Sequence, residues 1–108
     1  MSLDFYLECK CCGTPIFAQQ VTHNLNTMAG ACGLYGVMWH ASEDEGTLGR
    51  DCIERLEKGL AELKAHPDHY RKFNPENGWG SYNGLVKAAE KILEACKRYP
   101  DYKVWCCI

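Results

Sequence analysis

Apolar residues occupy every second position near both ends of the chain. The N-terminal set is Leu3, Phe5 and Leu7, and the C-terminal set is Val104, Cys106 and Ile108. This period of two is typical of a strand that buries one face. Residues 15–21 read as another strand after a short turn, which predicts an N-terminal β-hairpin. The C-terminal segment predicts a last strand that returns to this hairpin.

Between the strands, apolar residues recur every three or four positions, as on the buried face of a helix. A first helix is expected over residues 22–36, with Thr22 as its N-cap and glycines at its end. A second helix is expected over residues 48–65, with one short further turn after Pro67. A third helix begins after Ser81 and stops at Pro100.

These elements predict an α+β fold: a small antiparallel sheet, made of the N-terminal hairpin and the C-terminal strand, packed against three helices. At 108 residues the chain is expected to form a single domain, 1–108. The segment 38–46 is expected to be a polar loop or a short turn, which Trp39 pins to the body. Residues 74–82 are also expected to be a loop, because proline, asparagine and glycine are frequent there.

Charge and hydropathy then exclude several classes of function. The 12 basic and 14 acidic residues give a net charge of -2, and the basic residues do not gather in one stripe, so a nucleic-acid partner is not favoured. No apolar run reaches the roughly 20 residues that cross a bilayer. The first residues lack the basic and apolar regions of a signal peptide. We therefore expect a cytoplasmic protein without a membrane partner.

Eight cysteines are unusual for such a protein. Because a reducing compartment disfavours disulfides, metal binding or buried thiols are the expected uses. Cys9, Cys12 and Gly13 have the C-x-x-C-G spacing of a zinc knuckle. A structural zinc ion needs further ligands, and Cys106 is the candidate from the last strand, with His23 as another. Plain thiols, a disulfide or a catalytic Cys12 remain alternatives.

The other cysteines of the helices have a simpler interpretation. Cys32, Cys52 and Cys96 lie on the apolar faces of the expected helices. Cysteine packs well as a small hydrophobic residue. We therefore expect these three to be buried thiols.

Two polar stretches are candidates for a ligand site. Thr22, His23 and Asn24 stand at the expected start of the first helix, where unpaired N–H groups favour an anion. In the second stretch, two glycines flank Trp79, and Trp39 or Trp79 could stack on a planar ligand. The candidate ligand-binding residues are Thr22, His23, Asn24, Trp39, Asn77, Trp79 and Tyr82. In the alternative interpretation, these residues cap the helix and seal the core.

The same stretches resemble a group of small, functionally uncharacterised proteins of bacteriophages, prophages and bacteria. That group carries the patterns N-I-T-H-N-L and N-P-x-N-G-W-G-x-Y, and the likeness covers residues 17–100. The matching positions are Thr22, His23, Asn24, Leu25, Trp39, Asn74, Pro75, Asn77, Gly78, Trp79, Gly80 and Tyr82. This chain departs from the pattern at Gln20, Val21 and His40. The cysteine-rich ends are not part of the pattern, so the resemblance does not support zinc.

The resemblance implies an accessory protein of phage type, for which binding to a host protein or a small signalling molecule is a frequent role. We expect a non-enzymatic binding protein, monomeric or homo-oligomeric, that engages a protein partner or a small anionic ligand. One alternative is an interaction module held together by zinc. The other is a small hydrolase or transferase that uses His23 as a general base or Cys12 as a nucleophile.

Overall fold

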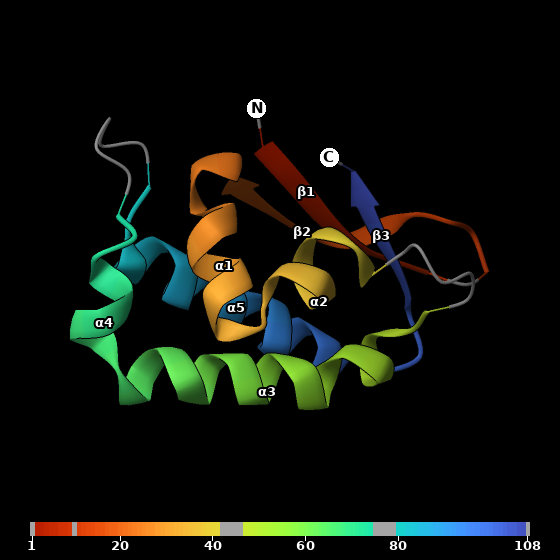
Figure 1. The fold of residues 1–108 in the computed structure, drawn as a ribbon. Helices are drawn as coiled ribbons and strands as arrows, with labels where there is room; N and C mark the ends of the chain where they lie inside the picture. The colour runs from red at the N-terminus through yellow and green to blue at the C-terminus, as the bar shows by residue number, and fades with distance from the viewer. Residues whose placement is uncertain (1, 10, 42–46, 75–79, 108) are drawn as a thin grey trace.

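The computed structural model describes residues 2–9, 11–41, 47–74 and 80–107. It has an α+β fold (Figure 1). The strands are β1 (Ser2–Glu8), β2 (Pro15–Thr22) and β3 (Lys103–Cys107). The helices are a 3-10 helix, η1 (His23–Leu25), and five α-helices of the described residues: α1 (Asn26–Cys32), α2 (Tyr35–Trp39), α3 (Gly49–Ala65), α4 (Pro67–Arg71) and α5 (Tyr82–Arg98).

The sheet has the strand order β2-β1-β3, and both pairs are antiparallel. This arrangement confirms the expected hairpin and the return of the last strand to it. Leu3, Phe5 and Leu7 of the central strand are fully buried, because alternate side chains of a strand point to the same face. Because Asp4 of β1 pairs with Cys107 of β3, the start of β1 and the end of β3 lie at the same end of the sheet (Figure 1).

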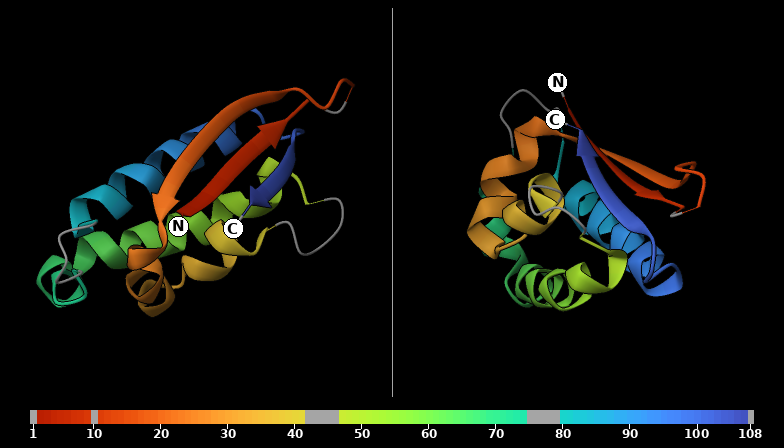
Figure 2. Two further views of the ribbon diagram at one scale, coloured as in Figure 1. Left: turned by 90° about the horizontal axis from the view of Figure 1, so that it is seen from above. Right: turned by 90° about the vertical axis from the view of Figure 1, so that its right-hand side faces the viewer.

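All the helices lie on one face of the sheet (Figure 2). The helix α5 runs below β2 and beside α3, and the two long helices are antiparallel. Their apolar stripes face inward. On their solvent-exposed sides an ion pair joins the two helices, with Lys64 Nζ 3.3 Å from Oε2 of Glu90. The expected cap of α5 is confirmed, because Ser81 Oγ accepts a hydrogen bond from the Gly84 N–H at 3.1 Å.

The expectation of one helix over residues 22–36 is wrong in its extent. The segment contains η1, α1 and the start of α2, and the break lies at Gly33, whose φ is +88°. A left-handed residue ends a helix, and glycine adopts that conformation without steric cost. Trp39 accordingly ends a helix rather than lying in a loop. The short turn expected after Pro67 is confirmed as α4.

One hydrophobic cluster joins the sheet to the helices. It contains side chains from every strand and from η1 and the five α-helices, among them Phe5, Leu25, Met38, Leu56 and Ile92. Apart from tyrosine and tryptophan, none of the described residues with a polar or charged side chain is buried. Within this described part of the chain, none of the helices combines the length and the apolar character that crossing a bilayer requires.

Candidate functional site

The side chain of His23 is fixed by a hydrogen bond to Trp39. The Trp39 indole N–H donates to Nδ1 of His23 at 2.9 Å, across 16 residues of sequence. Trp39 is 3% exposed, whereas His23 is half-buried. Because Nδ1 accepts this bond, the proton of the neutral imidazole stands on Nε2. The pair therefore presents an N–H donor on a rigid aromatic base.

Two further rings extend this pair over the surface. Tyr35 stacks on Trp39 with ring centroids 5.6 Å apart and an angle of 21° between the planes. His40 meets Tyr35 edge-on at 4.8 Å. Tyr35 is 36% exposed and, with Ile16 and Trp105, is one of the large apolar side chains of the described residues that reach solvent. We call His23, Tyr35, Trp39 and His40 the histidine–tryptophan surface.

The start of the first helix, where an anion site was expected, is a 3-10 helix of three residues and offers little positive potential. Thr22 caps a 3-10 helix of three residues, and its Oγ1 accepts the Asn24 N–H at 3.4 Å. Such a short turn aligns few peptide dipoles, so little positive potential accumulates there. Thr22 therefore caps this turn, as in the alternative interpretation, while Asn24 is exposed.

The second sequence motif meets the first at Gly80. A Cβ placed on Gly80 would lie 2.9 Å from Cγ2 of Thr22 and 3.0 Å from Cγ of Leu25. Gly80 has a φ of +110°, which L side chains rarely adopt. The close contact places the end of the 74–82 segment against η1. Asn77 and Trp79 lie outside the described residues.

Tyr82 has a structural position rather than a ligand-facing one. It is 7% exposed, and its hydroxyl donates to the Leu63 carbonyl at 2.7 Å. Its N–H donates to Oδ1 of Asn74 at 2.8 Å, and the Arg71 guanidinium lies 5.1 Å from the ring centroid. These contacts join the start of α5 to the end of α3 and to the segment after α4.

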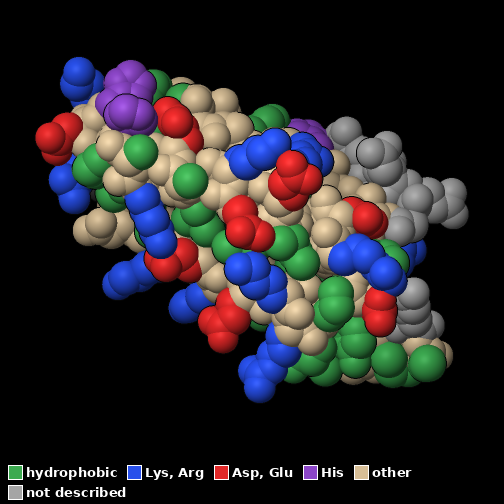
Figure 3. Space-filling view, turned by 90° about the horizontal axis from the view of Figure 1, so that it is seen from below, with side chains coloured by type: hydrophobic (Ala, Val, Ile, Leu, Met, Phe, Trp, Pro, Cys, Tyr) green, Lys and Arg blue, Asp and Glu red, His purple; other side chains and the backbone are tan. Residues whose placement is uncertain are grey.

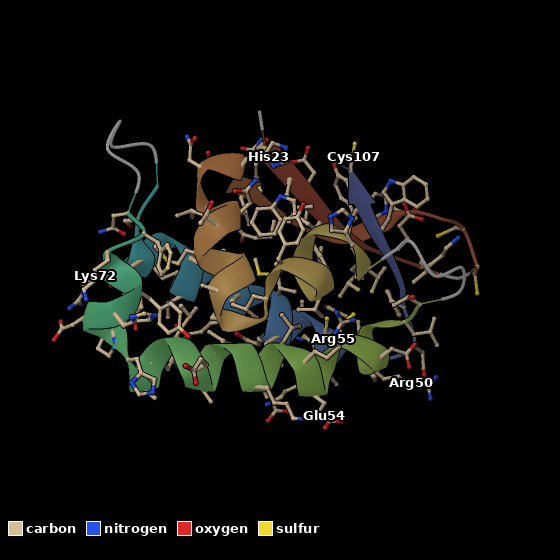
Figure 4. The ribbon with its side chains drawn as sticks, in the orientation of Figure 1. His23, Arg50, Glu54, Arg55, Lys72 and Cys107 are labelled. Carbon is tan, nitrogen blue, oxygen red and sulfur yellow. The ribbon has the colours of Figure 1, made fainter. Side chains whose placement is uncertain are left out.

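Sequence reasoning found His23 and Trp39 but missed Tyr35. Its signal was present, because residues 35 and 39 are four apart and therefore share a face of any helix that contains both. The predicted helix over residues 22–36 and the predicted loop over residues 38–46 separate Tyr35 from Trp39, so this spacing is not recognised. Figure 4 shows His23 at the end of the sheet where Cys107 also lies.

The three clustered cysteines lie at the opposite end of the hairpin, in the turn between β1 and β2. Cys9 N–H donates to the Thr14 carbonyl at 3.0 Å, and Gly13 N–H donates to the Cys9 carbonyl at 2.8 Å. Hydrogen bonds from the hydroxyl and N–H of Thr14 and from the Cys9 thiol lower the pKa of Cys12. Cys12 and Cys11 are exposed, whereas Cys9 is half-buried.

The predicted set of zinc ligands is not brought together. Cys106 pairs with Phe5, so Cys9 lies four residues further along β1, or about 13 Å away. Cys106 Sγ instead donates to the Met38 carbonyl at 3.2 Å. Among the described residues, no group of three or more histidine, cysteine, aspartate or glutamate side chains could share an ion.

His23 cannot complete that set either. It follows β2, whereas Cys12 precedes it, and the eight residues of β2 span about 25 Å. At that distance His23 cannot serve as the base that activates a Cys12 nucleophile.

The three helical cysteines are buried, as expected: Cys32 is 7%, Cys52 1% and Cys96 0% exposed. Burial raises the pKa of Cys32. A hydrogen bond between Cys52 and Cys96, together with burial, holds the pKa of Cys96 above its ordinary value. This interaction links α3 to α5, and no pattern in the sequence indicates which of the cysteines would interact. All eight cysteines are among the described residues, and none is in a disulfide.

Two surface hollows lie away from the histidine–tryptophan surface. One, between α3 and α5, has a volume of about 440 Å³ and is lined by Leu60, Leu93, Lys64, Glu90 and Glu94 among others. Figure 3 shows this face, where side chains of both charges alternate. The other lies between β2 and α5, beside Ile16 and Tyr99. The mixed charges of the first select no single class of ligand.

Comparisons of the chain with models of protein families, with curated proteins and with solved structures find no match. Its function must therefore be inferred from its own side chains.

Proposed function

We propose that the chain is a non-enzymatic binding protein that engages a protein partner through the histidine–tryptophan surface. The observation that carries this proposal is the hydrogen bond from Trp39 to His23, with Tyr35 stacked on the same indole. It fixes an exposed ring and an imidazole N–H in one orientation. Little side-chain entropy is then lost when a partner covers them.

The composition of this surface suits a protein interface. Tyrosine and tryptophan are frequent among the residues that dominate binding energy, because they combine a large apolar area with a polar edge. Tyr35 offers its exposed face, while His23 and the neighbouring exposed Asn24 provide polar groups at the margin. Gly80, from the second motif, packs against Thr22 and Leu25, which flank His23 and Asn24 in the sequence.

The competing functions have weaker support. Catalysis by His23 as a base would have to break its bond with Trp39, since Nδ1 is the nitrogen that lacks a proton. A small anionic ligand would depend on the three-residue turn η1. The resemblance to small phage and bacterial proteins supports a host protein as the partner. Eight cysteines without a disulfide suit the reducing conditions of a cytoplasm.

The test is affinity capture from a bacterial lysate with quantitative mass spectrometry. The bait is the intact chain, and it is compared with Tyr35→Ala and with His23→Ala. Lys72→Ala is the matched control, because Lys72 is exposed after α4, away from this surface (Figure 4). Thermal unfolding first establishes that every bait is folded.

We expect the proteins that the wild type enriches to fall at least about tenfold with Tyr35→Ala, since loss of a central aromatic residue typically costs more than 1 kcal/mol. Lys72→Ala should retain them. Equal enrichment by the wild type and by a His23→Ala/Tyr35→Ala double variant would contradict the proposal.

A further inference from the structure

One edge of the sheet has no partner strand among the described residues. In the order β2-β1-β3, β2 pairs with β1 along one side, and no other segment of the described part of the chain pairs with it. Outside this pairing, the described residues of β2 make no backbone–backbone hydrogen bond. Alternate residues of an antiparallel strand point their N–H and C=O groups away from the partner, so about half of β2 presents such groups outward.

The sequence of β2 does not protect this edge. Natural edge strands commonly carry lysine or another charged residue that discourages pairing with a further strand. The sequence of β2, PIFAQQVT, has no charged residue, and only Pro15 at its start lacks an N–H group. The opposite edge is partly covered, because Lys103 of β3 forms a bridge with Leu48 and the Val104 N–H donates to the Thr47 carbonyl at 2.9 Å. Of the two edges, β2 is therefore the one that accepts a further strand.

The helix α5 places charged side chains beside this open edge. In the left-hand view of Figure 2, α5 extends past β2 on the side away from β1. A hollow of about 260 Å³ lies between the two elements, and its lining includes Ile16, Phe17, Lys91, Glu94 and Arg98. Lys87 precedes Lys91 by four residues and so lies on the same side of the helix. The exposed charged residues on this side are three cations and one carboxylate: Lys87, Lys91, Arg98 and Glu94.

The position of these cations decides between two occupants of the edge. Phe17, near the start of β2, lines the hollow with the C-terminal part of α5, while Thr22, at the end of β2, lies against Gly80. The helix therefore runs antiparallel to β2, and Lys87 and Lys91 stand beside the middle of the strand. If a second copy added its β2 antiparallel to this one, the twofold axis would bring these lysines opposite those of the other copy. Like charges that face each other oppose association, so a segment with acidic residues fits this edge better.

We propose that β2 accepts a strand from another protein, an extended segment with acidic residues at alternate positions. Backbone hydrogen bonds to the free edge supply affinity, and the side chains that face α5 supply specificity. This site is separate from the histidine–tryptophan surface. That surface lies mainly on α2, which packs against β1 and β3, whereas the open edge lies on the β2 side of the sheet.

The test is a titration of the intact, ¹⁵N-labelled chain with a synthetic peptide that alternates glutamate and valine over seven residues, followed by NMR. The control peptide carries lysine in place of every glutamate. Lys91→Glu reverses one charge beside the open edge. Lys97→Glu is the matched control, because Lys97 is exposed on the same helix but lines the hollow toward α3. Thermal unfolding establishes that both variants are folded.

We expect the acidic peptide to bind with a Kd below about 1 mM, and the lysine peptide to bind at least about tenfold more weakly. Binding should slow hydrogen exchange at alternate amides of β2, which distinguishes strand addition from contact with α5 alone. Lys91→Glu should weaken binding about fivefold, and Lys97→Glu by less than about twofold. Tyr35→Ala should leave this binding unchanged, so the failure of this site and the failure of the proposed function are separable.

Three results would overturn the proposal. The first is equal binding of the two peptides, or no binding of the acidic peptide at 1 mM. The second is binding that leaves the exchange of the β2 amides unchanged. The third is a concentration-dependent dimer of the free chain that protects these amides, detected by sedimentation and hydrogen exchange, because a second copy would then occupy the edge.

Discussion

At the scale of single residues, Tyr70 shows how one hydrogen bond holds the short helix α4 against α3. Its ring is 3% exposed, and its hydroxyl donates to Oε1 of Glu62 at 2.8 Å. Burial and the carboxylate of Glu62 raise the pKa of Tyr70 to about 12. The bond joins α4 to α3 at the point where the chain turns after Ala65.

Replacement of Tyr70 by phenylalanine tests this contact through pH. The raised pKa means that the folded chain keeps the phenolic proton between pH 10 and about 12, while the unfolded chain loses it. Stability from this group is therefore complete below pH 10 and falls as pH rises through this window. Tyr70→Phe should cost about 1 kcal/mol at pH 8. It should also remove this part of the alkaline decline, measured by urea unfolding from pH 8 to 12. Parallel declines in both proteins would contradict the assignment.

Thr14 provides a second test at this scale. Because its hydroxyl and N–H lower the pKa of Cys12, Cys12 should be alkylated by iodoacetamide at pH 7 faster than the neighbouring exposed Cys11. Thr14→Val should slow the reaction of Cys12 and leave Cys11 unchanged. Tandem mass spectrometry of the peptide distinguishes the two sites. Equal slowing at both cysteines would instead indicate a general change in the turn.

At the scale of elements, the helix α3 shows what periodicity can and cannot predict. Its buried residues Cys52, Leu56, Leu60 and Leu63 recur at helical spacing, so both the helix and its inner face follow from the sequence. Gly59 lies on the same face and is also buried. From the sequence alone, this glycine is expected only to lower helix propensity. In the structure, its missing side chain leaves space for Leu34, which lies between α1 and α2.

A pair of glycine variants separates these two roles. A Cβ on Gly59 would lie 2.5 Å from Cγ of the buried Leu34, so Gly59→Ala should destabilise by about 1–3 kcal/mol despite better helix propensity. Gly84 in α5 is exposed, and a Cβ there would meet only Oγ of Ser81 at 3.4 Å. Gly84→Ala should therefore stabilise by about 0.5–1 kcal/mol. Urea unfolding measures both, and stabilisation by Gly59→Ala would refute the packing argument.

At the scale of the whole molecule, the sequence predicts the pairing of the elements more accurately than it predicts their register. Alternation identifies the buried faces of β1 and β3, and the return of the last strand follows from it. It does not give the register, which pairs Cys106 with Phe5 and so separates it from Cys9. Long-range contacts such as Cys52 with Cys96 leave no local pattern, because many inward-facing residues could have met instead.

Gly80 is the most consequential of these long-range contacts, because it joins two motifs that lie some 55 residues apart in sequence. Gly80→Ala combines an unfavourable φ of +110° with a Cβ that would lie 2.9 Å from Thr22. We expect a loss of at least about 2 kcal/mol, the sum of backbone strain and overpacking. Gly13→Ala is the matched control, since it has a positive φ but no neighbour within 4 Å, and it should lose only about 1 kcal/mol.

Hydrogen exchange then shows whether the contact holds the two motifs together. Gly80→Ala should speed the exchange of amides in residues 22–25, because η1 loses the surface against which it packs. Gly13→Ala should leave these amides unchanged and affect only the hairpin turn. If Gly80→Ala is as mild as Gly13→Ala and residues 22–25 keep their protection, then the margin of the histidine–tryptophan surface does not depend on the second motif, and the two must be treated as separate features of the fold.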